Sequence, residues 1–431
     1  MTSAYPIVFC PGFMGWNSDE TGLGKVLNYW GKNESYIKKL RKEGFNVYEG
    51  AVGPISSVWD RAIELYYCIH GGTVDYGIVH STRHGHARFG RTCPGFGFDW
   101  SATHKINLFG HSMGGSTIRL LTSLLNQGSE EEREAYRAAN EEVPIIFQGG
   151  HDFVFSVTCL NAAHSGTQLA NSQIISDIAK TAVAAIASLA GLDTDDDTTV
   201  FDFRLEHFGL QRELGEEYTS YLKRVQTSHI WHTAVYEDLA GYAVSSAGTE
   251  MQNRLYPAEK HVYYFNLASA STYSVPIMGI SIPRPTMSLI MWPTATFLGR
   301  TPLPGCDQTG SYENDGMAPF CSQIGPQIGA TDTIVSLAAV SQLVPGTIYF
   351  TRIDNTLDHI QVLGFGPHDV FPGYLNYVRF IGELGAAGSV GSRMKDALGT
   401  GFGATPTWAC VVYHLKLMLA VAFLKFRVSK W

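Results

Sequence analysis

The sequence predicts an α/β fold with a mostly parallel central sheet flanked by helices. Two observations carry this prediction: short, unbroken apolar runs bounded by turn residues, and a helical pattern directly after one of them. Such runs are typical of strands buried on both faces, and their alternation with helices favours parallel pairing. The 431 residues, 45% of them apolar, are enough to bury a large core.

Four segments have the pattern of core strands. They are 6–10 (PIVFC), 105–109 (KINLF), 153–160 (FVFSVTCL) and 260–268 (KHVYYFNLA). The first runs into the Gly-rich turn PGFMGW. The second runs into GHSMGG and then STIRLLTSLLNQ, where Ile118, Leu121 and Leu125 have the spacing of one helix face. We therefore expect a strand, a tight turn and a helix in immediate succession.

A long insertion separates the third and fourth strands. Within it, Ile174, Ile178, Ala182 and Ile186 recur every four residues, and most intervening positions are small or apolar. This pattern predicts a helix that is apolar over much of its circumference. It fits either a buried core helix or a lid that covers an apolar cleft and opens on a lipid surface.

The end of the chain differs from the rest. Residues 386–407 are rich in Gly, Ala and Ser and have the composition of a linker. Residues 408–431 are strongly apolar but are interrupted by His414 and Lys416, so they predict either a packed terminal helix or a membrane-associated one. We take 1–385 as the main domain, with 172–230 as its lid and insertion.

Charge and cysteine content narrow the class of protein. With 31 Lys and Arg against 39 Asp and Glu, the net charge of −8 disfavours nucleic acid as a partner. Seven cysteines without a CxxC pair predict no cysteine zinc site. Cys306 and Cys321 bracket one loop and could pair. MTSAYPIVFC shows no signal peptide.

A candidate nucleophile lies between the second strand and its helix. Gly110-His111-Ser112-Met113-Gly114 matches the G-x-S-x-G pattern. A tight turn there lifts the serine clear of the sheet and leaves the Met113 N–H, near the helix N-terminus, to bind an oxyanion. A structural serine in a Gly-rich turn is the alternative.

A serine nucleophile needs a base and an acid, which follow it in the order acid, then histidine. SYENDGMAP offers Asp315 in a polar turn. Of the histidines beyond it, His414 lies in the apolar tail and His368 is expected in a surface loop. His359 opens an apolar run and is the favoured base. The Phe13 N–H, after the first strand, is the expected second oxyanion donor.

Three histidines stand within seven residues in HSTRHGHARFG. Imidazole is the commonest zinc ligand, but a solvated His-rich loop has the same composition. His80 and His86 are six residues apart, which does not place them on one helix face, so we expect them on a loop or turn.

The chain resembles the zinc-containing thermoalkalophilic lipases of Gram-positive bacteria and their staphylococcal relatives. The resemblance covers about residues 5 to 385 and rests on segments in the family's order: AVGPISSVWDRA, GGTVDYG, HGHARFGRT, EEREAYRAAN, FDFRLEHFGLQRE and ENDG. It implies an α/β-hydrolase fold with a helical lid, in this chain at 172–191, and a small zinc-binding subdomain.

Position by position, the resemblance implies a triad of Ser112, Asp315 and His359, with Phe13 and Met113 as oxyanion donors. The chain differs from the family pattern at two places. Pro11-Gly12-Phe13 replaces the family's His-Gly-Phe, and Met113 replaces a Gln. Both differences are in side chains, whereas the expected oxyanion donors are backbone N–H groups.

The resemblance also implies a structural zinc site. Its ligands would be Asp60, His80, His86 and Asp238, and four protein ligands leave no open position for catalytic water. His84 matches no ligand. The family's calcium carboxylates are replaced here by Gln361 and Gly366, so calcium is not expected.

These features predict a triacylglycerol lipase or carboxylesterase that works through an acyl-enzyme at a lipid–water interface. The alternatives are a metal-dependent hydrolase centred on the His/Asp cluster and a catalytically inactive lipid-binding relative. The resemblance implies secretion. Without a visible signal peptide, an intracellular or membrane-associated location stays open.

Overall fold

We describe a computed structural model of the chain. It describes residues 5–18, 22–170, 201–231, 236–306, 312–387, 398 and 400–402. The predicted lid at 172–191, most of the predicted linker and the apolar segment 408–431 lie outside these residues. Within the described part, no helix is long and apolar enough to cross a membrane. The proposed domain boundaries stay predictions.

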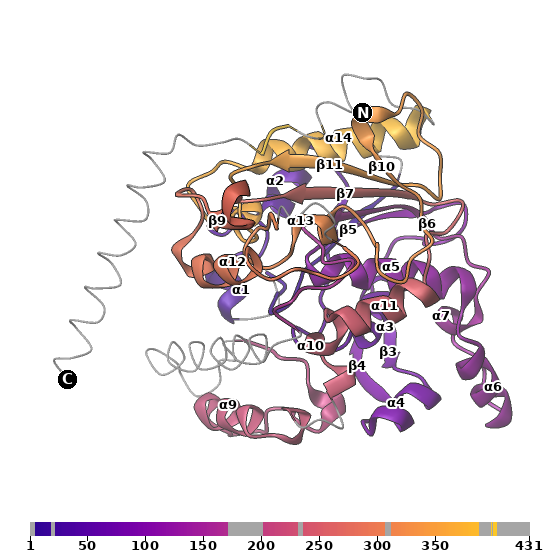
Figure 1. The fold of residues 1–431 in the computed structure, drawn as a ribbon. Helices are drawn as coiled ribbons and strands as arrows, with labels where there is room; N and C mark the ends of the chain where they lie inside the picture. The colour runs from indigo at the N-terminus through magenta and orange to yellow at the C-terminus, as the bar shows by residue number, and fades with distance from the viewer. Residues whose placement is uncertain are drawn as a thin grey trace.

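A seven-stranded sheet forms the centre of the molecule (Figure 1). Its strand order is β10-β11-β7-β6-β5-β1-β2, and every neighbouring pair is parallel. The strands are β1 Ile7–Cys10, β2 Val47–Glu49, β5 Ile106–His111, β6 Val154–Leu160, β7 Tyr263–Ser269, β10 Ile334–Ser336 and β11 Ile348–Asp354. The prediction of a mostly parallel sheet is confirmed.

Helices cover both faces of the sheet. The α-helices are α1 Gly22–Val26, α2 Tyr36–Lys42, α3 Val58–His70, α4 Ile78–His84, α5 Met113–Gln127, α6 Glu130–Ala138, α7 Ile145–Gln148, α9 Tyr218–Gln226, α10 Ala240–Ala243, α11 Ser246–Leu255, α12 Trp292–Leu298, α13 Phe320–Gln323 and α14 Phe371–Ala387. Side chains of α3 and α5 fill the core on one face, and those of α2 and α14 fill it on the other.

The first strand shows why the core strands could be predicted from the sequence. Ile7 and Phe9 pack with α2 and α14, while Val8 and Cys10 pack with α3 and α5. Because both faces are covered, all four side chains are fully buried, and the strand reads as an unbroken apolar run. All four predicted strands and the predicted helix after the second are present, within a few residues of the expected bounds.

Two antiparallel hairpins project from this frame. Hairpin β3 Gly72–Asp75 and β4 Phe89–Cys93 flanks α4, and hairpin β8 Thr272–Val275 and β9 Ile280–Pro283 follows β7 almost directly. The insertion beyond residue 200 packs on the loop after β1. Phe201, Phe203 and Leu222 form a separate apolar cluster there, against which Phe13 and Trp16 lie. Cys306 carries a free, buried thiol, so the possible pairing with Cys321 is not made.

Candidate active site and metal centre

The predicted nucleophile lies on a strained turn between β5 and α5. Ser112 has φ 55° and ψ −128°, a backbone conformation that L-residues rarely adopt. Glycines make the turn possible, because a Cβ on Gly114 would lie 2.5 Å from the Cys10 carbonyl oxygen. A Cβ on Gly12 would lie 2.8 Å from the Ser112 Cβ. The loop after β1 can therefore approach the serine closely.

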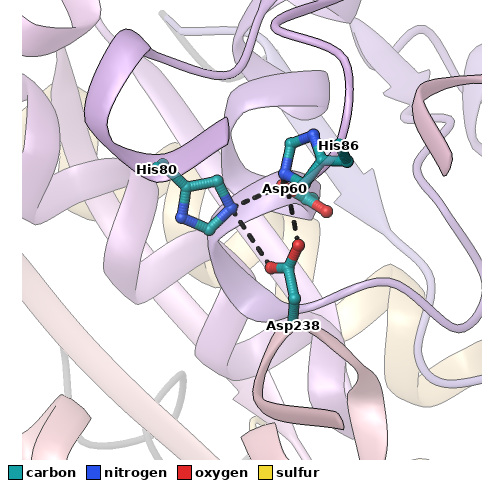
Figure 2. Close-up of side chains that lie close together, drawn as sticks. All are labelled: Asp60, His80, His86 and Asp238. Atoms are coloured by element: carbon teal, nitrogen blue, oxygen red, sulfur yellow. Dashed lines mark hydrogen bonds and ion pairs between the residues drawn. The ribbon is translucent and has the colours of Figure 1, made fainter. Parts of the chain in front are cut away.

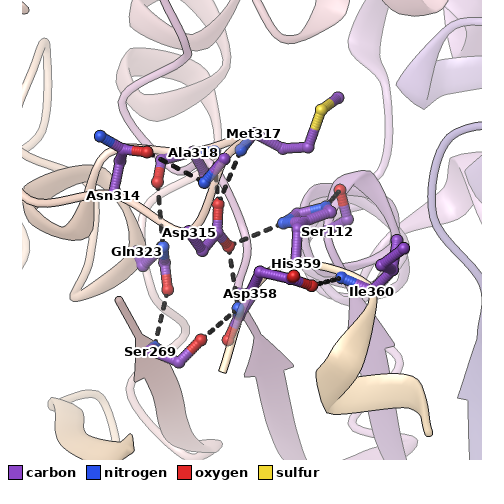
Figure 3. Close-up of polar contacts among 12 residues, drawn as sticks. Ser112, Ser269, Asn314, Asp315, Met317, Ala318, Gln323, Asp358, His359 and Ile360 are labelled. Atoms are coloured by element: carbon purple, nitrogen blue, oxygen red, sulfur yellow. Dashed lines mark hydrogen bonds and ion pairs between the residues drawn. The ribbon is translucent and has the colours of Figure 1, made fainter. Parts of the chain in front are cut away.

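The structure brings the three predicted triad residues together at the carboxyl ends of the strands (Figure 3). The His359 Nε2 is 2.8 Å from the Ser112 Oγ, and its Nδ1 is 2.7 Å from the Asp315 Oδ2. A second bond, from the His359 N–H to the Asp315 carbonyl oxygen at 2.9 Å, ties the two loops together. The imidazole is thus oriented to accept the serine proton.

Asp315 is fully buried, so its charge depends on protein donors. The Met317 and Ala318 amides donate to Oδ1 at 2.9 and 2.7 Å. The Asn161 Nδ2 donates to Oδ2 at 2.8 Å and to the Ser269 Oγ at 2.7 Å. Together with the contact to the His359 ring, the carboxylate has four hydrogen-bond partners, which fix its position beside the imidazole.

The loop that carries Phe13 is fixed on both sides of that residue. The Gly12 N–H donates to the Tyr29 Oη at 2.8 Å, and the Met14 N–H donates to the Pro54 carbonyl oxygen at 2.9 Å. Met113, the other expected oxyanion donor, is the first residue of α5, where amides have no partner within the helix. Both expected donors therefore lie on backbone next to Ser112.

A buried bridge joins this loop to His359. The His111 Nε2 is 3.0 Å from the His359 carbonyl oxygen, and its Nδ1 is 2.7 Å from the Tyr29 Oη. Burial lowers the pKa of His111 well below its usual value, and the neighbouring His359 lowers it further. The ring is neutral, and the carbonyl accepts, so Nε2 carries the proton and Tyr29 donates to Nδ1. Tyr29 has no sequence signal that marks this role.

The remaining candidate base differs from expectation. His368 was expected in a surface loop, but it is only 4% exposed, so that expectation was wrong. The residue lies in the segment between His359 and α14. His414 lies outside the described residues.

The predicted metal ligands also converge (Figure 2). One ligand atom from each of Asp60, His80, His86 and Asp238 lies within 4.8 Å of the other three. The His80 Nε2 is 3.0 Å from Asp60 and 3.1 Å from Asp238, and the His86 Nε2 is 3.2 Å from Asp238 and 3.9 Å from Asp60. Ligands about 2.0–2.1 Å from a tetrahedral zinc would stand roughly 3.3 Å apart. Three of these four separations are close to that value, and the fourth, between His86 and Asp60, is longer at 3.9 Å.

The chemistry of the four converging side chains fits a bound cation. The His86 Nδ1 is bonded to the Ala87 carbonyl oxygen at 2.9 Å, which places the proton there and leaves a lone pair on Nε2. That lone pair faces an oxygen of Asp238, and none of these atoms has a partner with hydrogen-bond geometry. Two imidazoles and two carboxylates would exactly balance the charge of Zn²⁺, so the residues fit this metal.

Hydrogen bonds perturb the acids and bases of the cluster. Burial raises the pKa of Asp60, but hydrogen bonds from His207 and His80 outweigh it and hold that pKa far below its usual value. Burial lowers the pKa of His80, yet the carboxylates of Asp238 and Asp60 close to its Nε2 raise it to about 9. In the absence of metal, the cluster therefore holds protons where the cation would sit.

His207 is a participant that the sequence analysis did not identify. Its Nε2 is 3.2 Å from the second oxygen of Asp60, so it orients that carboxylate. Ion pairs from Arg91 to Asp202 and Glu206 hold its segment against β4. The only sequence signal was its place within FDFRLEHFGLQRE, a segment that carries the family resemblance.

The expectation of a loop for the histidine run was wrong for His80, which lies in α4, and correct for His86. The physical reason is Gly85, which ends the helix in the left-handed region with φ 71°. The chain reverses there and returns His86 beside His80. His84 is the last residue of the helix and is not among the four converging ligands.

Hydrogen bonds from other protein groups hold the loop after His359 in place. The Gln361 amide donates to the Thr286 carbonyl oxygen at 2.8 Å and accepts from the Asp358 N–H at 3.1 Å. Asp358 is fully buried and accepts the Ser288 N–H at 2.6 Å. Gln361 therefore links this loop to the segment before α12 without a charge.

Comparisons with known proteins identify the family of the chain. The family described as "Lipase-like, C-terminal domain" matches residues 3–373. Lipase 2 of Staphylococcus aureus is 33% identical over 325 residues, which are 75% of this chain and 45% of that protein. The chain thus spans less than half the length of this curated relative.

Solved structures show the same fold. EstA from Clostridium botulinum has a TM-score of 0.78 and 35% identity, with 89% of this chain and 88% of that one covered. The Staphylococcus hyicus lipase has a TM-score of 0.69 and 30% identity, with 84% and 89% covered. The predicted α/β-hydrolase architecture is confirmed, and the chain belongs to the lipase-like C-terminal domain family that includes the staphylococcal lipases.

Proposed function

We propose that this protein is a serine ester hydrolase that acts on lipid esters, as a triacylglycerol lipase or a broad carboxylesterase. One observation carries the proposal: the hydrogen-bonded chain from Ser112 through His359 to the buried Asp315. Membership of the lipase-like family supports it. Secretion stays a prediction.

In the proposed mechanism, each group has one role. His359 takes the Ser112 proton as the hydroxyl attacks the ester carbonyl, and Asp315 stabilises the resulting imidazolium. The Phe13 and Met113 amides bind the oxyanion of the tetrahedral intermediate. His359 then protonates the departing alcohol, and water, activated by the same imidazole, releases the acid from the acyl-enzyme.

Two rival functions are disfavoured. A metal-dependent hydrolase needs an open coordination position, but the side chains of Asp60, His86 and Asp238 are fully buried and that of His80 is 9% exposed. An inactive lipid-binding relative has no need of a complete proton relay on a strained serine. We therefore assign the cluster a structural role, with zinc as the ion that fits it.

Replacement of the nucleophile tests the main proposal. Ser112→Ala should abolish hydrolysis of a chromogenic ester without loss of folding, because every chemical step passes through that hydroxyl. The matched control is Ser116→Ala, one turn further along α5, which should keep full activity. A serine-directed phosphonate should label the wild-type chain once, at Ser112. Labelling of another residue, or an active alanine variant, would refute the assignment.

A further inference from the structure

Exposed apolar side chains gather on one part of the surface. Ten large apolar residues are exposed in the described part of the chain, and five of them lie between 273 and 292. The five are Tyr273, Ile277, Met278, Ile290 and Trp292. Ile277 is 101% exposed, Ile290 75% and Met278 67%, so these are not partly covered edges of the core. We call these five residues the hairpin–helix surface.

The elements that carry this surface are joined to one another. Ile277 and Met278 form the tip of the β8–β9 hairpin, and Ile290 and Trp292 lie at the start of α12. The Ser281 N–H donates to the Gly299 carbonyl oxygen at 2.7 Å, which packs β9 against the end of α12. Hydrogen bonding of Trp292 Nε1 to the Met287 carbonyl oxygen at 3.2 Å orients its indole.

The charge of the segment is unlike that of the whole chain. Residues 272–300 contain two basic side chains, Arg284 and Arg300, and no Asp or Glu, although the chain carries a net charge of −8. Arg284 lies over the Tyr273 ring, 5.5 Å from its centroid. Apolar, aromatic and basic side chains without carboxylates are the composition that binds an anionic lipid–water interface.

The same segment contacts the proposed catalytic loops. The Ser288 N–H donates to Asp358, the residue before His359. The Asn314 amide, beside Asp315, donates to the Ala295 carbonyl oxygen of α12 at 3.2 Å. The hairpin follows β7 directly and so lies at the carboxyl ends of the strands, as the proposed triad does (Figure 1). A lipid bound to this surface would lie at the same end of the sheet as Ser112.

We propose that the hairpin–helix surface docks the protein on an anionic lipid–water interface. The inference rests on the proposed function, because it supplies the substrate surface on which that esterase would act. Ile277 and Met278 enter the acyl region, Tyr273 and Trp292 lie at the level of the head groups, and Arg284 and Arg300 face lipid phosphates.

Vesicle binding by the full-length protein tests the proposal. The vesicles contain ether-linked phosphatidylcholine, with or without phosphatidylglycerol, so that hydrolysis cannot remove them. Wild type should bind the mixed vesicles several-fold more tightly than phosphatidylcholine alone. The double variant Ile277→Glu/Met278→Glu should lose roughly tenfold or more in affinity, and Arg300→Gln should lose about fivefold.

The matched control is Val344→Glu, because Val344 is 57% exposed but lies in the loop that enters β11, at the other end of the sheet. It should bind vesicles as wild type does. All variants should hydrolyse a soluble short-chain ester at the wild-type rate, which shows that they are folded. Failure of wild type to hydrolyse any ester would refute the proposed function. Vesicle binding is measured independently of hydrolysis, so it tests the docking proposal separately.

Two results would overturn the docking proposal. One is equal vesicle affinity of wild type and the Ile277→Glu/Met278→Glu variant. The other is self-association of wild type in solution, measured by light scattering, that the double variant abolishes without any vesicle binding by wild type. That second result would make the surface an interface between copies of the chain.

Discussion

Removal of the Tyr29 hydroxyl tests whether the buried bridge positions the catalytic groups. In Tyr29→Phe, the Gly12 N–H and the His111 Nδ1 each lose their partner, and both are buried. A buried polar group left unsatisfied costs about 1–3 kcal/mol, so the free energy of unfolding should fall by roughly 2–4 kcal/mol. Urea unfolding followed by intrinsic fluorescence measures this loss.

The effect on catalysis separates a positioning role from a purely structural one. Gly12 precedes Phe13, whose amide is the proposed oxyanion donor, and His111 holds the carbonyl of His359. Complete loss of an oxyanion donor costs about 10²–10³ in kcat, so a loosened loop should cost roughly 10- to 100-fold. KM for a soluble ester should change little, because the bridge touches no part of the bound substrate.

Tyr264→Phe is the matched control. Its buried hydroxyl accepts the Glu259 N–H at 3.0 Å, as that of Tyr29 accepts the Gly12 N–H, but it lies on β7 away from the triad. It should lose stability without loss of kcat. If Tyr29→Phe keeps the wild-type kcat at a temperature where both variants are folded, or if both tyrosine variants lose the same fraction of kcat, the positioning role is refuted.

Three further predictions follow from the same structure. Metal removal should lower the melting temperature, because a bound ligand at a thousandfold excess over its Kd stabilises the folded state by about 4 kcal/mol, but ester hydrolysis should persist below that transition. Elemental analysis should find zinc lost in His86→Ala and kept in His84→Ala. A folded but inactive metal-free protein would contradict a structural role. Asn161→Ala removes one charge-assisted bond from Asp315 and should lower kcat roughly tenfold, as steady-state kinetics would show; an unchanged kcat would exclude Asn161 from the relay. Burial and a neighbouring arginine hold the pKa of His164 well below its usual value, so the unfolded chain takes up a proton at a higher pH than the folded chain does. The free energy of unfolding should therefore fall below about pH 6.5, by roughly 1.4 kcal/mol at pH 5.5. This decrease, measured by urea unfolding at several pH values, should vanish in His164→Gln.

The sheet illustrates how far sequence pattern reaches. The strands at its centre are covered by helices on both faces and read as apolar runs, so they were predictable. Strands β2 and β10 have three residues each and lie at the two edges, and runs of that length carry no clear period. Their existence depends on the neighbouring strand to which they pair.

Local sequence predicted the strained turn that carries Ser112, but it did not predict the hydrogen-bonded residues around the proposed triad. A strand, a Gly-rich turn and a helix in succession are enough to place Ser112, because those residues are adjacent in the chain. Tyr29 and Asn161 reach the site from other parts of the chain, and they lie 83 and 49 residues from Ser112 in the sequence. No periodicity links such residues, since only folding brings them together.

The residues of the candidate metal cluster were also only partly predictable from the sequence. Composition pointed to the three histidines of the run, and the family resemblance selected His80 and His86 from them and added Asp60 and Asp238. The histidine run by itself was equally consistent with a solvated loop. The tertiary structure speaks against a solvated loop, because α3, α4, the loop after α4 and the segment before α10 bring the four side chains into one cluster. It also adds His207, whose bond to Asp60 spans 147 residues of sequence.

Local patterns in the sequence predicted the features whose physical cause lies in neighbouring residues, namely the buried parallel strands and the tight turn at Ser112. The family resemblance implied the proposed triad and zinc ligands. Only the folded chain shows which groups lie close enough to share a proton or a cation, because hydrogen bonds and desolvation depend on distances across the fold. The tautomer of His111, the four hydrogen-bond partners of Asp315 and the lone pair of His86 facing Asp238 belong to this last class.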